Sequence, residues 1–324
     1  MARGDAGDAG LRARRSAVAT ALCVSTLLVF AAWVVGFVAT DRWRATQFLW
    51  WVPSPAYLAA ALPGAIVAGL FGRRVAPRWR LAAISAFTAM FGAAVWNDVG
   101  WRGARPNDGD LSLVHWNASW PDADECSEAA RSILARDADV VVISNPHRFF
   151  GDGRAALWRG RGYDVVVAGS FAIASRIPLL EARAVDVGLG QSAGTFVLDA
   201  RATHGRMLTL LAIDLPSSPT RERFAIAADF AARLGHQLGR APDIVVGDFN
   251  ITRGSASLSL LSEGMHHAWD DGGRGWSGTW PRSFPALHLD HVFLSPPLSA
   301  SLYQAFDPGS GAHRAQECHI RTPG

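Results

Sequence analysis

Asp248 and Asn250 stand two residues apart where the apolar stretch DIVVGDF (243–249) ends. In a β-strand, side chains i and i+2 point to the same face, so this spacing predicts that the carboxylate and the carboxamide share one space. Such a pair suits a hydrated cation or a phosphate. Gly, Asp and Asn also end strands in ordinary turns, so the pair needs support from the rest of the chain.

Polar residues recur where other short apolar segments end. Each has a structural explanation by itself, but their number and order indicate one shared site. They are Asn117 after LVHW, Asn145 after DVVVIS, Arg176 after FAIAS, Asp214 in LLAIDLPSS, Trp280 in SGTWP, Asp290 in LHLDHVFLSP and His313 in GSGAHRAQ.

The elements that must position these residues are short strands with few helices between them. The pattern predicts strands over 111–116, 140–144, 164–168, 171–175, 195–202, 208–215, 244–249, 288–294 and 315–320, and helices over 125–136 and 221–238. Many strands with few crossover helices favour two packed, largely antiparallel sheets with helices outside. The expected class is therefore α/β.

The series of polar strand ends resembles the endonuclease/exonuclease/phosphatase superfamily of metal-dependent phosphoesterases, over about residues 110 to 324. The resemblance implies a four-layer αβ sandwich of two mostly antiparallel sheets with Mg²⁺ or Mn²⁺ at one edge. It implies catalytic roles for Asp248, Asn250, His313 and Asp290. It also implies a metal site at Asn117 and Asn145, and a phosphate or substrate contact at Asp214. Arg176 and Trp280 are further expected contacts with phosphate or substrate, and Asp214 is our additional candidate for a metal ligand.

Three positions depart from that family pattern. Asn145 stands in place of the family's metal-binding Glu, Asp214 in place of a His, and Ala312 in place of an Asp. A carboxamide ligand carries no charge, so the metal site is expected to be weakened. Losing the acid at 312 is expected to leave His313 without the group that fixes its tautomer. We hypothesise that Asp214 takes over part of the missing Glu's role, against the alternative of a decayed site.

The first third of the chain predicts a membrane anchor of two to three transmembrane helices, over 17–39, 48–72 and 81–96, within a domain 1–105. Residues 1–105 hold 12 arginines and four acidic residues, a net charge of +8. Arginine clusters lie before the first apolar run and between the second and third, so both segments are expected in the cytoplasm. With three spans, the inner-membrane protein carries its domain 106–324 outside the cytoplasm; with two, inside.

The remainder of the chain holds 19 arginines, 24 acidic residues and no lysine, a net charge of −5. This balance disfavours a nuclease, because nucleic-acid backbones require clustered positive charge. Three functions stay open: a phosphoesterase acting on a small phosphorylated or lipid-headgroup substrate, a catalytically impaired binding module, and, less favoured, a nuclease. Cys126 and Cys318 are expected to form a disulfide if this part is extracytoplasmic. Neither the substrate nor the oligomeric state follows from the sequence.

Overall fold

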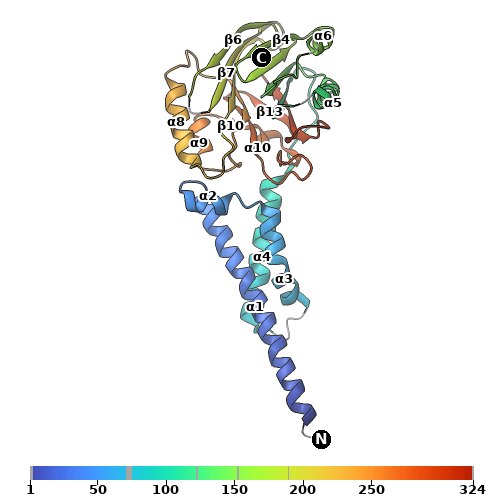
Figure 1. Ribbon diagram of the computed structural model, residues 1–324, viewed down its shortest axis with the longest axis vertical. Helices are drawn as coiled ribbons and strands as arrows, with labels where there is room; N and C mark the ends of the chain where they lie inside the picture. Colours follow the sequence, from blue (N-terminus) through green and yellow to red (C-terminus); the bar gives the residue numbers. More distant parts are fainter. Residues whose placement is uncertain (1–2, 71–74, 122, 152, 189, 323–324) are drawn as a thin grey trace. The chain divides into compact units, whose positions relative to one another are not determined.

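The computed structural model describes residues 3–70, 75–121, 123–151, 153–188 and 190–322 (Figure 1). The chain divides into two compact units, Met1–Asn97 and Asp98–Gly324. The division therefore falls at Asn97, whereas the sequence placed it at residue 105. Each unit is described by itself.

The first unit is helical. It contains α1 (Arg3–Ala39), α2 (Arg44–Trp50), α3 (Ser54–Leu70) and α4 (Pro77–Asp98), whose last residue begins the second unit. Helices α1 and α3 pack closely at Gly64, where a Cβ would lie 2.1 Å from the carbonyl oxygen of Leu22. The hydroxyl of Thr26 donates a hydrogen bond to the carbonyl of Ala61 at 2.9 Å. Small residues permit such close helix contacts in apolar surroundings.

Two helices of the described residues are long and apolar enough to cross a membrane, Gly10–Ala39 and Pro77–Asp98. A third span arises only if α2 and α3, which meet at an angle of 72°, act as one broken span. Helices α1, α3 and α4 expose large apolar side chains such as Leu28, Leu70 and Leu81. Because water would disfavour these surfaces, the helices are suited to lipid.

The second unit contains two six-stranded sheets. One has the order β10-β12-β9-β8-β7-β6 and the other the order β13-β14-β2-β3-β5-β4. The first comprises β6 (Leu179–Val185), β7 (Ser192–Ala200), β8 (Arg206–Asp214), β9 (Ile244–Asp248), β10 (His266–His267) and β12 (Asp290–Leu294). The second comprises β2 (Leu111–Asn117), β3 (Val140–Ser144), β4 (Asp164–Ala168), β5 (Phe171–Ser175), β13 (Ser299–Phe306) and β14 (Ala315–Arg321). A small extra sheet pairs β1 (Val99–Trp101) with β11 (Arg274–Trp276).

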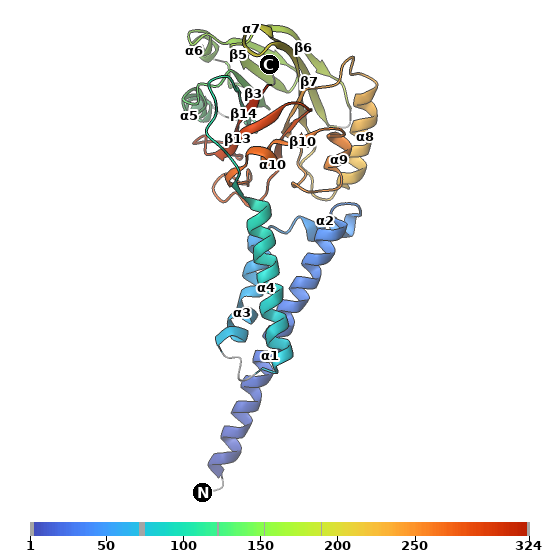
Figure 2. The same cartoon turned by 180° about the vertical axis from the view of Figure 1, so that it is seen from behind.

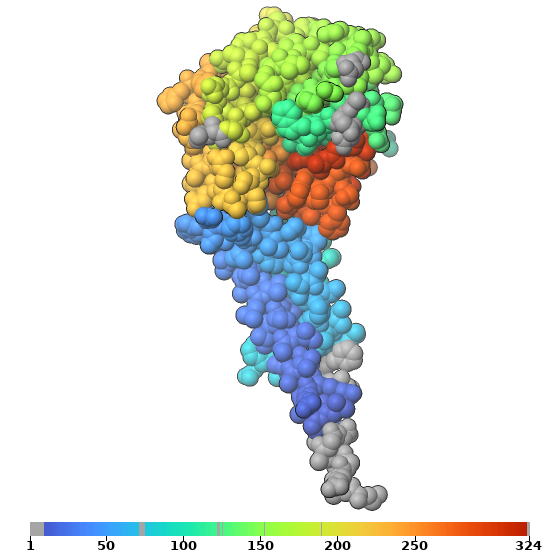
Figure 3. Space-filling view, in the orientation of Figure 1, coloured from blue at the N-terminus to red at the C-terminus, as the bar shows by residue number. Residues whose placement is uncertain are grey.

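The two sheets pack face to face with helices outside, so the unit has four layers. Helices α8 (Arg223–Gly235) and α9 (Leu258–Leu261) lie on one side, and α5 (Ala123–Leu134) and α6 (Arg154–Arg159) lie on the other (Figures 1 and 2). One buried apolar cluster fills the space between the sheets, and a further cluster lies under each helical layer. In Figure 3, within this unit, the orange and red surface of the C-terminal segments borders the green surface around α5 and α6.

The predicted α/β class, with two sheets and outer helices, is confirmed. Strands β3, β4 and β5 begin and end where predicted. The prediction missed strands β6 and β13, the short strands β1, β10 and β11, and the short helices α6, α7 (Arg201–His204), α9 and α10 (Ala268–Gly272). Strand β6 is an edge strand with the polar, largely exposed sequence LLEARAV, so it lacks the apolar run that marks a buried strand.

The predicted disulfide is wrong. Cys318 lies in the apolar cluster between the two sheets, whereas Cys126 lies in the cluster between the other face of that sheet and α5. A strand separates the two sulfurs, and no disulfide joins them. The sequence showed that both segments are near the second sheet, but not on which face each thiol lies.

Candidate active site

The polar residues that end the predicted strands gather at one end of the space between the two sheets. Residues Leu113, Ala212, Val246 and Val292 all belong to the apolar cluster between the sheets. Because side chains alternate along a strand, residues two or four positions away point to the same face. His115 and Asn117, Asp214, Asp248 and Asp290 are therefore the polar continuation of the apolar core.

Three aspartates lie side by side on neighbouring strands of one sheet. Asp248 is the register partner of Asp214 across the parallel β8–β9 pair and of Asp290 across the antiparallel β9–β12 pair. Strand β9 can approach β8 this closely because residue 247 is glycine: a Cβ there would lie 1.8 Å from the carbonyl oxygen of Ile213. Gly247 thus serves the packing that aligns the three acids.

Amide side chains from the other sheet hold two of these acids. The Nδ2 of Asn117 donates to the Oδ2 of Asp248 at 2.7 Å. The Nδ2 of Asn145 donates to the Oδ2 of Asp214 at 3.0 Å and to the Oδ1 of Asn117 at 3.2 Å. The bonds to Asp248 and Asp214 cross from one sheet to the other, so they fix the width of the site as well as the orientation of the acids, and the bond between Asn145 and Asn117 joins the two amides within one sheet.

Asp248 and Asn250 meet through a turn rather than along a strand. Strand β9 ends at Asp248, and Asn250 has a positive φ of 49°, a conformation that Asn tolerates better than most residues. The backbone nitrogen of Asn250 donates to Oδ1 of Asp248 at 2.9 Å, and its Nδ2 donates to Oδ2 at 3.0 Å. The sequence correctly predicted that the two side chains lie close together, but the reason was wrong. The prediction extended the strand one residue too far and attributed the contact to strand alternation, whereas a turn produces it.

A second acid orients His313. The Nδ1 of His313 lies 2.9 Å from Oδ2 of Asp290, and its Nε2 lies 3.7 Å from Oδ2 of Asp248. The expectation that His313 lacks an orienting acid because residue 312 is Ala is therefore wrong. Asp290, 23 residues earlier in the chain, supplies the carboxylate from β12.

The charges of the site are unbalanced because three neighbouring carboxylates, two buried and one partly buried, lie near one imidazole. Burial, together with the charge of Asp290, raises the pKa of Asp248 to about 8. Burial likewise raises the pKa of Asp214 to about 6. Although burial lowers it, the charges of Asp290 and Asp248 raise the pKa of His313 to about 9. The Asp290–His313 pair is thus ionic at neutral pH.

The prediction missed two residues that support this group. His115 is buried beside Asp290, its Nε2 lies 3.0 Å from the hydroxyl of Ser144, and burial lowers its pKa to about 4. The hydroxyl oxygen of Thr279 accepts hydrogen bonds from the backbone nitrogens of Leu289 and Asp290. His115 is two residues before Asn117, so the same spacing rule that paired Asp248 with Asn250 could have found it.

Most of the site residues, from His115 to Asp290, fall within one matched region of the chain, and His313 lies one residue beyond its end. The sequence profile described as the Endonuclease/Exonuclease/phosphatase family matches residues 114–312, more than half of the chain. The chain belongs to this family. A search of curated proteins found no match.

Solved structures share the fold of this family member. A D. rerio TDP2 humanized by 14 mutations is 18% identical, with a TM-score of 0.52, over 66% of this chain and 100% of that chain. The human Nocturnin catalytic domain with bound sulfate is 16% identical, with a TM-score of 0.54, over 68% and 97%. An endonuclease/exonuclease/phosphatase family protein from Bacteroides thetaiotaomicron is 16% identical, with a TM-score of 0.50, over 68% and 99%. At these identities the similarity establishes the fold alone.

Enzymes of the endonuclease/exonuclease/phosphatase family typically use divalent metal ions, and the side chains of this site fit one. Asp248, Asp290 and His313 offer ligand atoms that all lie within 4.8 Å of one another. The Oδ1 of Asp290 is buried without a hydrogen-bond partner among the described residues. Crowded, incompletely neutralised carboxylates are the environment that a divalent cation stabilises. The ion's identity does not follow from these residues.

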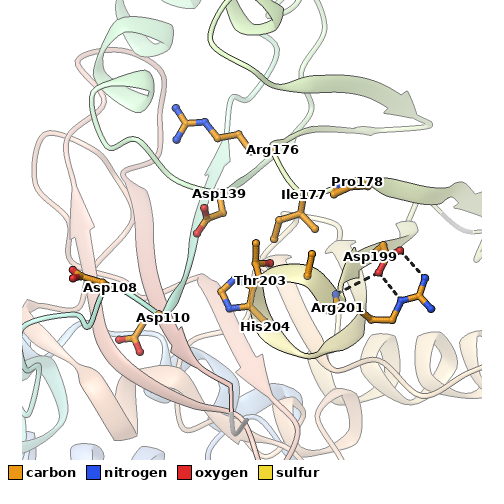
Figure 4. Close-up of a pocket in the computed structure, with 12 residues that line it drawn as sticks. Asp108, Asp110, Asp139, Arg176, Ile177, Pro178, Asp199, Arg201, Thr203 and His204 are labelled. Carbon is orange, nitrogen blue, oxygen red and sulfur yellow. Dashed lines mark hydrogen bonds and ion pairs between the residues drawn. The ribbon is translucent and has the colours of Figure 1, made fainter.

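Arg176 lies at the opposite end of the sheets from this site. The strand before it ends at Ser175, which pairs with Val140 at the start of β3, whereas Asn145 follows the end of β3. Arg176 stacks on Tyr163, forms an ion pair with Asp137, and lines a pocket of about 520 Å³ there (Figure 4). Because β5 runs antiparallel to β3, the end of β5 that leads to Arg176 lies far from the end of β3 that leads to Asn145. The structure therefore gives no support to the expected contact of Arg176 with a phosphate at the site.

Trp280 lies on a loop that adjoins His313. The backbone nitrogen of Arg314 donates to the carbonyl of Thr279, and that of Arg282 donates to the carbonyl of Ala312, each at 2.8 Å. Trp280 is 39% exposed. Trp280 therefore lies at the rim of the site, and part of its ring is exposed to solvent.

Three further histidines, His267, His288 and His291, form a buried cluster behind β12. The Nδ1 of His267 accepts a hydrogen bond from the backbone nitrogen of Trp269, which places its proton on Nε2 for donation to Nδ1 of His291. The Nε2 of His291 in turn donates to the carbonyl of Ile251. Both nitrogens of His267 and of His291 are thereby used, so these two rings form a neutral hydrogen-bonded chain that supports β12. The Nε2 of His288 lies 3.2 Å from the hydroxyl of Tyr303, and its Nδ1 has no hydrogen-bond partner among the described residues.

Proposed function

We propose that this chain is a membrane-anchored, divalent-metal-dependent phosphoesterase that hydrolyses a phosphomonoester or phosphodiester with an activated water. The observation that supports this most is the arrangement around Asp248. Its carboxylate accepts three N–H donors from Asn117 and Asn250, and the ionic Asp290–His313 pair stands 3.7 Å away. A held carboxylate beside a fixed imidazolium suits proton transfer at a phosphoryl centre.

Each site residue has a distinct role in this proposal. Asp248 in its ionised form, which predominates above its pKa of about 8, accepts the proton of the attacking water. Asn250 and Asn117 keep its carboxylate aligned through their amide nitrogens. His313, protonated by its raised pKa, donates a hydrogen bond to a phosphoryl oxygen. Asp290 holds the ring of His313 by its Nδ1 and so directs Nε2 toward the reacting centre.

Asp214, Asn145 and Asn117 are the proposed metal-binding side of the site, together with the Oδ1 of Asp290, which has no hydrogen-bond partner among the described residues. The proposed ion is Mg²⁺ or Mn²⁺. When bound, a divalent cation neutralises phosphoryl oxygens and the carboxylates around them. Asp214 provides a charged oxygen next to Asn145, the residue at which the family pattern has Glu. Asn145 aligns this carboxylate in place of contributing a charge itself, which predicts weaker metal binding than that of a two-carboxylate site.

A direct test uses the full chain in detergent with a panel of phosphomonoesters, phosphodiesters and phospholipids, in Mg²⁺, in Mn²⁺ and in EDTA. We expect hydrolysis of at least one ester that EDTA abolishes and that Asp248→Asn removes. Absence of hydrolysis throughout, with binding of an ester that does not depend on metal, would instead support a binding module. A nuclease, disfavoured by the charge of −5 on residues 106–324, requires salt-dependent binding and cleavage of DNA or RNA in the same assay.

The membrane topology is part of the proposal. If α2 and α3 form one broken span, three crossings and the basic cytoplasmic segments place the C-terminal unit outside the cytoplasm, anchored in the inner membrane. A C-terminal alkaline phosphatase fusion is expected to be active and a C-terminal green fluorescent protein fusion dark. The reverse result would establish two crossings and an internal C-terminal unit.

A further inference from the structure

Three loops next to the proposed active site carry large exposed aromatic rings. Trp120 is 65% exposed, Phe284 67% and Trp280 39%. Such rings are costly to leave in water, because each presents a large apolar surface. A soluble domain normally buries them, so three on one rim indicate a surface that contacts something apolar.

The three rings lie on loops that the structure joins around His313. Trp120 follows the turn in which the backbone nitrogen of Ser119 donates to the Oδ1 of Asn117. The loop before His313 packs on the same region, since a Cβ at Gly311 would lie 2.7 Å from the ring of Trp116. On its other side, that loop hydrogen-bonds to the segment 279–282 that leads to Phe284.

The chain enters the second unit next to these loops. The carbonyl of Asp98, the last residue of α4, accepts a hydrogen bond from the backbone nitrogen of Ser277 at 2.9 Å. Two residues later, Thr279 hydrogen-bonds to the backbone of Asp290. Asp98 directly follows a stretch of α4 that is apolar and long enough to cross a membrane, so along the chain the last membrane-spanning residues immediately precede the residue that contacts these loops.

We propose that Trp120, Trp280 and Phe284 contact the lipid surface, and that the substrate is an amphiphilic phosphoester held in that surface. Trp and Phe favour the boundary between water and lipid, where an apolar ring and a polar edge are both accommodated. A lipid phosphate presented there meets the polar site with its alkyl chain still in the bilayer. This substrate assignment rests on the proposed phosphoesterase function.

The substrate is tested with two probes that share a leaving group: hexadecyl 4-nitrophenyl phosphate in vesicles of phosphatidylcholine and phosphatidylglycerol, and ethyl 4-nitrophenyl phosphate in solution. The full chain is reconstituted in the same vesicles. The double variant Trp120→Ala, Phe284→Ala is expected to hydrolyse the hexadecyl ester about 10-fold more slowly and the ethyl ester within about twofold of the unmodified chain. An equal loss on both probes, or no loss on either, overturns the substrate assignment.

Contact with lipid is tested without any activity. The native cysteines are buried, so an environment-sensitive fluorophore can be attached to Phe284→Cys, and to Leu180→Cys as a control. Leu180, 54% exposed, lies in β6 at the end of the sheets opposite the site. Lipids that carry a quencher near the headgroup are expected to quench the label at 284 and to spare the label at 180.

The two tests fail separately. Equal quenching at both positions, or none at 284, overturns the lipid contact whatever the enzyme hydrolyses. Hydrolysis of neither probe by the unmodified chain overturns the substrate assignment, and the panel assay above then shows whether the phosphoesterase function fails with it.

Discussion

The acidic residues at the two ends of the sheets in the second unit have different partners. At the end opposite the candidate site, acids have positive or backbone partners: Asp199 pairs with Arg201, Asp137 with Arg176, and Asp243 with Arg206. At the site end, Asp248 and Asp290 are buried and Asp214 is partly buried. Amides contact Asp214 and Asp248, and one imidazole lies beside Asp290 and Asp248. Both ends are rich in polar residues in the sequence.

This difference between the two ends distinguishes acids with a structural role from acids with a functional role. An arginine that pairs with an acidic side chain lowers the pKa of the carboxyl group and keeps it ionised. Arg201 in this way lowers the pKa of Asp199 to about 2. Acids that are buried and underpaired have raised pKa values and gain from protonation or from a cation. Such environments are where proton transfer and metal binding occur.

The largest expected effect comes from exchanging one acid at each end. Asp248→Asn should lower the hydrolysis rate by roughly 10³-fold or more, because positioned proton transfer contributes about 10² to 10⁴ and alignment is also lost. Asp199→Asn should change the rate by less than about twofold. The measurement is the steady-state rate on the best ester of the panel, with unfolding temperatures to verify folding. Equal losses in both variants would remove the distinction between the ends.

The imidazole should come next. His313→Gln should lower the rate by about 10²-fold, since a neutral side chain cannot supply the charge of the raised-pKa imidazolium. Asp290→Asn should have a similar effect and should also lower the pKa of His313, measurable by NMR titration of the imidazole. An unchanged titration in Asp290→Asn would contradict the orienting role.

Metal binding should depend on Asp214. We expect Asp214→Asn to weaken Mn²⁺ binding by about 10- to 100-fold, measured by calorimetry. Asp139→Asn, at the other end, is the matched control and should leave binding unchanged. Unaltered affinity in Asp214→Asn would reject the compensation for Asn145 while leaving the catalytic role of Asp248 untouched.

Stability in EDTA should fall as the pH rises. The pKa values of Asp214, Asp248 and His313, about 6, 8 and 9, are raised above their ordinary values of 3.8, 3.8 and 6.5. Groups with raised pKa values stabilise the fold when protonated, and this contribution is lost as the pH passes the folded value. The unfolding temperature should therefore decrease from pH 5 to pH 9, by at least about 5 °C. Asp248→Asn should flatten the decrease, and Asp199→Asn should not.

The smallest effect should follow removal of Arg176. Its ion pair with Asp137 is largely exposed, and exposed pairs contribute only about 0 to 1 kcal/mol. Arg176→Ala should leave hydrolysis within about twofold and lower the unfolding temperature slightly. A large loss of activity would mean that the far end of the sheets takes part in the reaction.

Most of the buried strands, and the polar residues near their ends, could be predicted from the sequence alone. Alternation and strand length identified β2, β3, β8, β9 and β12, because buried strands leave long apolar runs that only a core can satisfy. Each acid or amide at such an end was visible as a break in that run. Exposed β6 left no comparable signal, and Cys126 and Cys318 could not be assigned to faces of the sheet.

Which strand ends lie together could be seen only in the three-dimensional structure. Whether a polar end joins the site depends on the direction of its strand, which is set by pairing with distant segments: antiparallel pairing carries Arg176 away and brings Asp290 to Asp248. The same pairing gives His313 its acid from β12, which no local pattern around Ala312 could reveal. Side-chain chemistry and local periodicity are properties of short segments, whereas register and strand direction are properties of contacts between segments far apart in the chain.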